Sequence, residues 1–233
     1  MKKILFIILI SCFSLIIISC SEDKEESTTD TVSTTSQMGG SIQGAELSLS
    51  TVVTTLAGTV DNGSANSTGT SASFYLPQGI TTDGTNLYVT DSENHLIRKI
   101  VISTGVVTTL AGTVDNGSAN GTGTSASFRS PMGITTDGTN LYVTEYADHR
   151  IRQIVISTGA VTTLAGTGSS GSANGTGTAA SFNKPAGITT DGTNLYVADT
   201  FYNHLIRQIV LSTGAVTTLA GTGSSGSANG TGT

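Results

Sequence analysis

The chain has 233 residues, among them 29 Gly, 3 Pro and no Trp, and a formal net charge of −6 from 10 basic and 16 acidic residues. This length suits one domain. Val, Ile and Thr recur throughout and no amphipathic helical pattern follows residue 20, so we expect β-strands and turns. The acidic balance argues against nucleic acid as a partner.

Residues 1–19 are typical of an export signal, with Lys2 and Lys3 before an apolar run from Ile4 to Ile18. The run is shorter than the roughly 20 apolar residues of a simple transmembrane anchor. It ends in Ile17-Ile18-Ser19-Cys20, which resembles the lipobox of bacterial lipoproteins. The resemblance implies that the protein is exported and that lipid on Cys20 anchors it to a membrane of the cell envelope, in a leaflet left open. An ordinary secreted protein is the alternative.

A flexible tether is expected next, because residues 20–48 are rich in Ser, Thr and acid and too poor in apolar residues to form a core. Cys12 would leave with the signal and the Cys20 sulfur would carry lipid. No disulfide is therefore expected, and residues 49–233 must be stabilised by packing alone.

The sequence TTLAGT recurs along residues 49–233, with Leu56, Leu110, Leu164 and Leu219 spaced by 54, 54 and 55 residues. A fixed period of this size indicates a repeat architecture. In the second unit, four strand candidates stand between turn signals: GITT, NLYVT, RIRQIVI and AVTTLAG. Asp137-Gly138-Thr139 predicts a tight hairpin between the first two. We expect a Gly-rich crossing over Gly112–Pro131 before each new sheet.

The third strand of a unit is apolar on both faces, since Ile97 and Val101 point one way and Ile100 and Ile102 the other. Both faces therefore need cover, and radial stacking of four-stranded sheets provides it, as in a β-propeller. The innermost strands would carry Ile80, Ile134 and Ile188. The second strands would carry Leu87, Val89, Leu141, Val143, Leu195 and Val197.

Two of the units, SFYLPQGITTDGTNLYVTDSENHLIRKI and SFNKPAGITTDGTNLYVADTFYNHLIRQI, resemble NHL repeats and include Asn94-His95-Leu96 and Asn203-His204-Leu205. The middle unit departs from the pattern with Asp148-His149-Arg150. The resemblance implies an all-β fold, a β-propeller of four-stranded antiparallel NHL-type blades.

The propeller is expected to be incomplete, with three blades plus an extra N-terminal outer strand at Ser50–Gly58. Propellers typically have 4 to 8 blades. The sequence therefore predicts either a truncated fragment of a longer propeller or self-association of copies to complete the ring.

Several residues recur at one position of every unit, which favours structural roles for them. The acids Asp91, Glu145 and Asp199 are expected to form local ion pairs with Arg98, Arg152 and Arg207, or to cap the turn. His95, His149 and His204 are expected to form structural hydrogen bonds. Zinc ligation by these three imidazoles is the weaker alternative. Asp61 and Asp115 in the crossings are too few carboxylates for calcium.

The positions that vary between units gather at the start of the inner strands and at the second turn, where loops on a rigid scaffold present a binding face. We expect binding by the following residues: Tyr75, Gln78, Arg129, Met132, Lys184, Tyr146, Phe201 and Tyr202. No nucleophile elbow, phosphate loop or paired catalytic carboxylates are evident. The predicted function is a non-catalytic, membrane-tethered scaffold that binds a protein or a glycan, without a cofactor. The alternative, implied by the family resemblance, is a metal-dependent lyase or lactonase-like enzyme using His95, His149 and His204.

Overall fold

The computed structural model describes residues 52–232. The expected signal peptide, Cys20 and the acidic linker lie outside the described residues. Within residues 52–232 the helices are 3-10 turns of three residues, and none is long and apolar enough to cross a bilayer. The described part of the chain is therefore all-β, as the sequence predicts.

Three antiparallel sheets follow one another along the chain, and each is called a blade here. Blade 1 consists of β1 (Pro77–Thr82), β2 (Asn86–Asp91), β3 (Leu96–Val101) and β4 (Val107–Ala111). Blade 2 consists of β6 (Pro131–Thr136), β7 (Asn140–Glu145), β8 (Arg150–Val155) and β9 (Ala160–Ala165). Blade 3 consists of β11 (Pro185–Thr190), β12 (Asn194–Asp199), β13 (Leu205–Val210) and β14 (Ala215–Ala220). The four-stranded meander predicted for each unit is confirmed.

The crossings contain more structure than the sequence indicated. The short strand β5 (Gly121–Thr122) pairs with β9, and β10 (Gly175–Thr176) pairs with β14. The 3-10 turns η1 (Gly69–Ser71), η3 (Gly123–Ser125) and η4 (Gly177–Ala179) also lie in the crossings, whereas η2 (Ser92–Asn94) follows β2. The crossings into blades 2 and 3 thus each add a fifth edge strand, which the Gly-rich composition concealed, whereas the sheet of blade 1 has four strands and the crossing before it contributes an isolated bridge from Thr68 to Val106.

Of the extra outer strand expected at Ser50–Gly58, the structure describes residues 52–58, and these form no strand because they have no strand pairing. In each blade the fourth strand pairs with the third strand of its own sheet. Residues 52–58 have no such neighbour in the described part of the chain. A strand without a ladder partner leaves its backbone groups to water, so the sequence match to β4, β9 and β14 does not by itself produce a strand.

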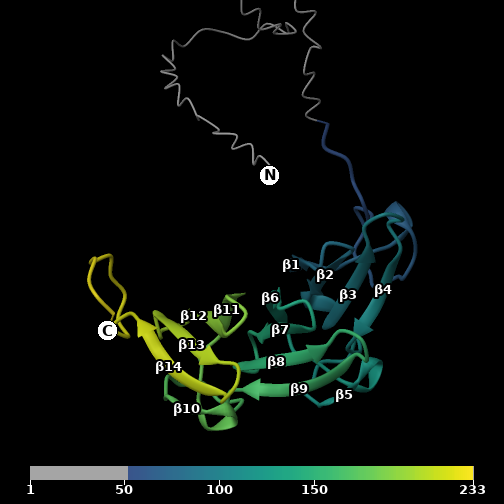
Figure 1. Cartoon of the computed structure of the whole chain (residues 1–233). Coiled ribbons are helices and arrows are strands. Elements are labelled where there is room, and N and C mark those ends of the chain that lie inside the picture. Colours follow the sequence, from purple (N-terminus) through teal and green to yellow (C-terminus); the bar gives the residue numbers. More distant parts are fainter. Residues whose placement is uncertain (1–51, 233) are drawn as a thin grey trace, which may run out of the picture. The chain divides into compact units, whose positions relative to one another are not determined.

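The blades lie face to face in an arc, with β1, β6 and β11 side by side on the inner edge and β4, β9 and β14 outside (Figure 1). Between blades 1 and 2, Tyr88 and Ile97 pack against Leu141 and Ile154. Between blades 2 and 3, the corresponding cluster is Tyr142, Ile151, Ala165, Leu195, Val197, Ile209 and Val216. Burying one such Leu or Ile contributes about 1.5–3 kcal/mol. The core therefore lies between the sheets, and the ring is not closed.

The third strand is apolar on both faces, as predicted. Ile97 belongs to the cluster against blade 2, and Ile100 belongs to a cluster on the opposite face with Val89 and Val107. Ile102 lies beyond the end of β3 and is 39% exposed. The inner-strand isoleucines occupy β1, β6 and β11 as expected, but Ile80 is exposed where Ile134 is buried, since blade 1 covers Ile134 and no described blade covers Ile80.

The predicted hairpin between the first two strands is held by Asp137. Its carboxylate accepts hydrogen bonds from the backbone N–H groups of Thr139 (2.8 Å) and Asn140 (2.7 Å) and from the Tyr142 hydroxyl (2.7 Å). Asp83 and Asp191 do the same in the other blades. In blade 1, hydrogen bonds lower the pKa of Asp83, and the largest contribution comes from the Asn86 side chain. The pKa of Tyr88 is raised to about 12, mainly by burial and then by the hydrogen bond to Asp83.

Candidate functional site

A buried Arg and carboxylate stand at the same place in every blade. The distance from the Arg Nη1 atom to a carboxylate oxygen is 2.7 Å for Arg98 and Asp91, 3.0 Å for Arg152 and Glu145, and 3.1 Å for Arg207 and Asp199. All six side chains are fully buried. Each guanidinium also lies 5.0–5.3 Å from the centre of a Phe ring. The predicted structural ion pairs are confirmed.

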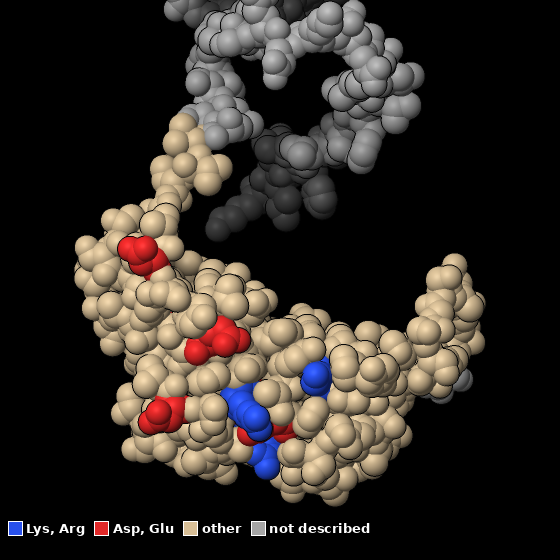
Figure 2. Space-filling model, turned by 180° about the vertical axis from the view of Figure 1, so that it is seen from behind, with Lys and Arg blue, Asp and Glu red and all other residues tan. Residues whose placement is uncertain are grey.

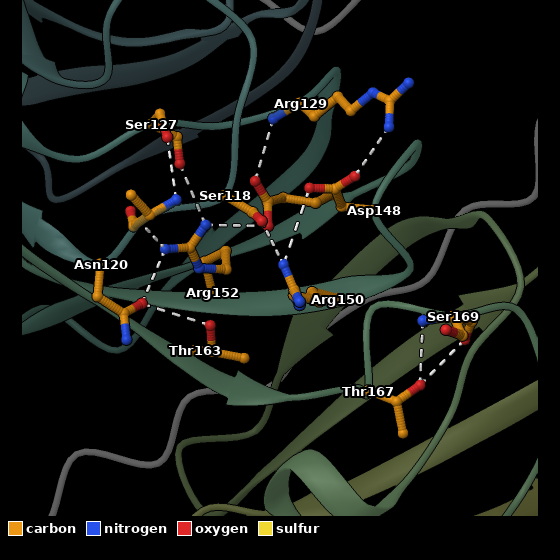
Figure 3. Close-up of polar contacts among 12 residues, drawn as sticks. Ser118, Asn120, Ser127, Arg129, Asp148, Arg150, Arg152, Thr163, Thr167 and Ser169 are labelled. Atoms are coloured by element: carbon orange, nitrogen blue, oxygen red, sulfur yellow. Dashed lines mark hydrogen bonds and ion pairs between the residues drawn. The ribbon is translucent and has the colours of Figure 1, made fainter.

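The guanidinium groups also fasten the crossing loops to the blades. In blade 2, Arg152 donates to the carbonyl oxygens of Ser127 (3.2 Å) and Ala119 (3.1 Å) and to Oδ1 of Asn120 (2.9 Å), as Figure 3 shows. Blades 1 and 3 repeat these contacts. An isolated buried charge would be costly, so the Arg is paired and surrounded by acceptors. These residues build the scaffold.

The carboxylates also hold the first variable residue of each blade by its backbone. The N–H groups of Tyr75, Arg129 and Asn183 donate to Asp91, Glu145 and Asp199 at 2.6, 3.1 and 2.7 Å. The main chain is therefore fixed at a position whose side chain differs in every blade. A fixed backbone with a changeable side chain is the arrangement expected of a recognition position.

Two of the recurring histidines link one blade to the next. Nδ1 of His95 accepts the N–H of Ser130 at 3.3 Å, and Nδ1 of His149 accepts the N–H of Lys184 at 3.0 Å. Burial lowers the pKa of His149, which favours the neutral ring that this acceptor role needs. The three imidazoles do not converge, and residues 52–232 contain no group of three or more His, Cys, Asp or Glu that could hold a metal ion. The geometry therefore gives no support to the zinc alternative.

The variable residues of blades 2 and 3 converge at one end of the sheets. Nζ of Lys184 lies 4.0 Å from the centre of the Phe201 ring and 5.3 Å from that of Tyr146. Phe201 and Tyr202 meet edge to face at 4.3 Å, and they are 39% and 73% exposed. We call Arg129, Tyr146, Lys184, Phe201 and Tyr202 the variable patch.

Arg129 joins this patch through the turn after β7. Its guanidinium pairs with Asp148 at 3.3 Å, and Asp148 also faces Arg150 at 3.8 Å (Figure 3). Asp148 immediately precedes His149, which accepts the backbone N–H of Lys184. On the face seen in Figure 2, basic side chains gather in one region together with an acidic group, and further acidic side chains lie elsewhere on a surface that is mostly uncharged.

The other predicted binding residues lie elsewhere. Tyr75 lines a cavity of about 750 Å³ between the segment Ala57–Asn62 and the start of β1. Gln78 is exposed on β1, and Met132 is half-buried on β6, where its carbonyl oxygen accepts a hydrogen bond from Thr90 of blade 1 at 2.6 Å. The structure thus brings five of the eight predicted residues together and leaves Tyr75, Gln78 and Met132 apart from them.

Sequence reasoning did not include Asp148 and Arg150 among the binding residues. The signal was present, because the middle unit has Asp148-His149-Arg150 where the others have Asn-His-Leu. Asn94 and Asn203 donate to the buried Asp91 and Asp199 at 2.9 and 2.7 Å. The Asp148 carboxylate has no N–H to donate, so it pairs with Arg129 and Arg150 instead. Glu145 therefore lacks the hydrogen bond that an Asn amide donates to Asp91 and Asp199. Burial raises the pKa of Glu145 to about 7 and outweighs the lowering by Arg152 and by the N–H of Arg129, and the charge of Asp148 adds a smaller increase.

Comparison with known proteins agrees with this architecture. Residues 74–100 match the NHL repeat family. The human NHL repeat-containing protein 2 is 34% identical over 164 residues, which cover 64% of this chain and 22% of that protein. The Arabidopsis thaliana chloroplast protein SUPPRESSOR OF QUENCHING 1 is 35% identical over 161 residues, covering 64% of this chain and 15% of that protein. The chain therefore spans about a fifth or less of the length of these relatives.

The fold also resembles a solved structure, an auxiliary nutrient binding protein from Bacteroides ovatus. It has a TM-score of 0.50 and 20% identity, and the match covers 70% of this chain and 44% of that one. This likeness concerns the fold alone. The chain therefore contains an NHL repeat within an open stack of β-propeller blades.

Proposed function

We propose that this protein is a non-catalytic binding scaffold of the bacterial cell envelope, tethered through lipid on Cys20, whose variable patch binds a protein or a glycan. The observation that carries the proposal is the convergence of Arg129, Tyr146, Lys184, Phe201 and Tyr202 at one end of blades 2 and 3. The pair of a buried Arg with a carboxylate and the backbone contact of the first variable residue are the same in each blade, so these contacts give the variable side chains no reason to differ.

The chemistry of the patch suits recognition. The rings of Phe201 and Tyr202 offer exposed apolar surface next to the ammonium of Lys184, and the Arg129 side chain is 53% exposed. Aromatic and Arg side chains are enriched at binding hot spots. A sugar ring or a peptide side chain could stack on the aromatic rings while a carboxylate or hydroxyl of the ligand accepts from Lys184 and Arg129.

The experiment that tests the proposal is a binding measurement on the purified protein with a panel of envelope glycans and peptides. We expect Phe201→Ala to weaken the binding of any ligand found by about tenfold or more. Tyr75→Ala is the matched control, because Tyr75 is also variable and exposed but lies outside the patch. Equal affinity of the Phe201→Ala and wild-type proteins would refute the assignment of the patch.

A further inference from the structure

Positive charge gathers at the junction between blades 2 and 3. Within residues 52–232, the Lys and Arg side chains that are not buried are Lys99, Arg129, Arg150 and Lys184. The last three lie at this junction with Asp148, and we call Arg129, Asp148, Arg150 and Lys184 the cationic cluster. The cluster contains three cations and one carboxylate, although the formal net charge of the chain is −6.

The cations of the cluster are additions to the repeated scaffold. In the other two blades the equivalent positions hold uncharged residues: Tyr75 and Asn183 for Arg129, Leu96 and Leu205 for Arg150, and Leu76 and Ser130 for Lys184. The backbone does not change with them, since Lys184 has a φ of 53° and its two equivalents have 49° and 48°. The blades therefore form with or without these charges, which leaves recognition of an anion as a role for them.

We infer that the ligand of the variable patch is an acidic glycan, whose sugar carboxylates bind to the cationic cluster. This inference rests on the proposed function, because it names the chemical class of the ligand at the same site. Ammonium and guanidinium groups form their strong, charge-assisted hydrogen bonds with carboxylates. A neutral ligand would leave this excess of positive charge without a partner.

The ammonium of Lys184 is held in place without being neutralised. It lies 4.0 Å from the centre of the Phe201 ring and 5.3 Å from that of Tyr146, and no carboxylate of residues 52–232 lies within 4.0 Å of it. The two rings attract the cation but carry no charge of their own. A positioned side chain also loses less freedom when a ligand binds, so Lys184 is ready to receive an anion.

The two guanidinium groups share a single carboxylate. Asp148 lies 3.3 Å from Arg129 and 3.8 Å from Arg150, whose side chains are 53% and 25% exposed (Figure 3). Each guanidinium has more N–H donors than this one contact uses. Burial is the main cause of the lowered pKa of His149, and Asp148 opposes the shift. Lys184 and Arg129 add to it, so cations from both blades lie near the same ring.

A glycan suits this surface better than an acidic peptide does. Extended peptides bind largely through free backbone groups of a sheet edge. In the patch, the backbone N–H groups of Arg129, Tyr146, Lys184 and Phe201 are all bonded within the protein. Recognition there depends on side chains. A uronic acid offers a ring that stacks on an aromatic side chain and a carboxylate that accepts from a neighbouring cation, which matches the contact of Lys184 with Phe201.

The test is calorimetric titration of the full chain, purified in a mild detergent, with oligosaccharides of galacturonate, mannuronate and glucuronate. The same oligosaccharides with their carboxyl groups reduced to alcohols serve as neutral counterparts. We expect at least one acidic series to bind, and its neutral counterpart to bind about tenfold more weakly. Lys184→Gln should weaken binding of the acidic form by about tenfold. Lys99→Gln is the matched control, because Lys99 is also not buried but lies outside the cluster, and it should leave the affinity unchanged.

A second variant guards against misfolding, because it should strengthen binding. Asp148→Asn removes the carboxylate that competes with the ligand for Arg129 and Arg150. We expect it to tighten binding of the acidic oligosaccharide by about threefold. A misfolded protein would not gain affinity.

Equal affinity for the acidic and neutral forms would overturn the inference. So would the absence of binding by all three acidic series, tighter binding of hexaglutamate, or acidic binding that is the same in the Lys184→Gln and wild-type proteins. The proposed function survives these results if another ligand binds and Phe201→Ala weakens its binding. It fails when no bound ligand depends on Phe201, so the two failures are distinguishable.

Discussion

Glu145 shows how one residue can change the chemistry of a repeated network. Asp91 and Asp199 each accept a hydrogen bond from an Asn amide, at 2.9 and 2.7 Å, in addition to the bond from Arg. Glu145 accepts from Arg152 and from the N–H of Arg129, but Asp148 stands where that Asn would be. Burial is the main reason why the pKa of Glu145 is raised to about 7 while it remains paired, and the missing donor and the like charge of Asp148 add to this shift.

The raised pKa predicts a loss of stability as the pH rises. Between the ordinary value of 4.5 and the folded value of about 7, the folded state binds more protons than the unfolded state, so the free energy of unfolding falls with pH in this window. Asp148→Asn would supply the missing donor and remove the like charge. We expect it to flatten the fall and to stabilise the protein at pH 7.5 by about 1–2 kcal/mol, measured by urea unfolding at pH 5 and 7.5.

The opposite substitution in blade 1 is the control for this prediction. Asn94→Asp would place a second carboxylate beside the buried Asp91 and should destabilise the protein at pH 7.5 by about 3 kcal/mol. The surface pairs of Asp148 with Arg129 and Arg150 contribute little by comparison. If the Asp148→Asn and wild-type proteins have the same pH dependence, Asp148 is not a cause of the shift at Glu145.

At the scale of the elements, the hairpin between the first two strands of each blade depends on one carboxylate. Asp137 accepts the N–H groups of Thr139 and Asn140, the Asn140 side-chain amide at 3.2 Å and the Tyr142 hydroxyl. Burial raises the pKa of Asp137, but these hydrogen bonds outweigh it and the net shift is downward. The turn is thus specified locally, and for this reason the Asp-Gly-Thr signal located it in the sequence.

Asp137→Ala should destabilise the protein by about 1–2 kcal/mol at pH 7. Because the folded pKa is lowered, the stabilisation by this carboxylate is present above the ordinary value of 3.8 and is lost as the pH falls through the folded pKa. The difference in melting temperature between variant and wild type should therefore shrink below about pH 4. Asp115→Ala, in an exposed part of a crossing, is the control and should change stability by less than about 0.5 kcal/mol. An equal effect of the two substitutions would contradict the role given to Asp137.

At the scale of the whole molecule, no blade is covered on both faces except blade 2. A single four-stranded sheet cannot bury two apolar faces, so each blade depends on its neighbours. The buried Arg network repeats within each blade, the His contacts repeat at each inner junction, and the variable patch spans blades 2 and 3. The patch is therefore a property of the stack, and a single repeat would not reproduce it.

The proposed membrane tether is tested at this scale too. Cys20→Ser would remove the sulfur that we propose carries the lipid, and with it the strong membrane binding that acyl chains provide. We expect the wild type to fractionate with membranes and to incorporate labelled palmitate, and the variant to do neither. Ser21→Ala is the control, since it changes the neighbouring residue and leaves the sulfur in place. Membrane fractionation of the Cys20→Ser protein equal to that of the wild type would refute the tether.

Much of the fold and part of the candidate site could be predicted from the sequence. The strands, the Asp137 hairpin and the pairs of Arg98, Arg152 and Arg207 depend on local pattern and on a repeat that shows the same residues three times. The edge strands β5 and β10 were missed because Gly and Thr in a crossing give no strand signal. The strand expected over residues 50–58 was wrong because its pattern was present but its ladder partner was not.

The sequence by itself determined the blade, because alternating apolar residues and turn-specific Asp and Gly define a four-stranded meander through contacts a few residues apart. Only the tertiary structure decided which variable residues meet. Lys184 reaches Tyr146 and Phe201 because blades 2 and 3 lie face to face, whereas Tyr75 lines a cavity beside residues 57–62 and the start of β1. Contacts between blades join residues about one repeat apart, and their geometry follows from how whole sheets stack, which no local pattern encodes.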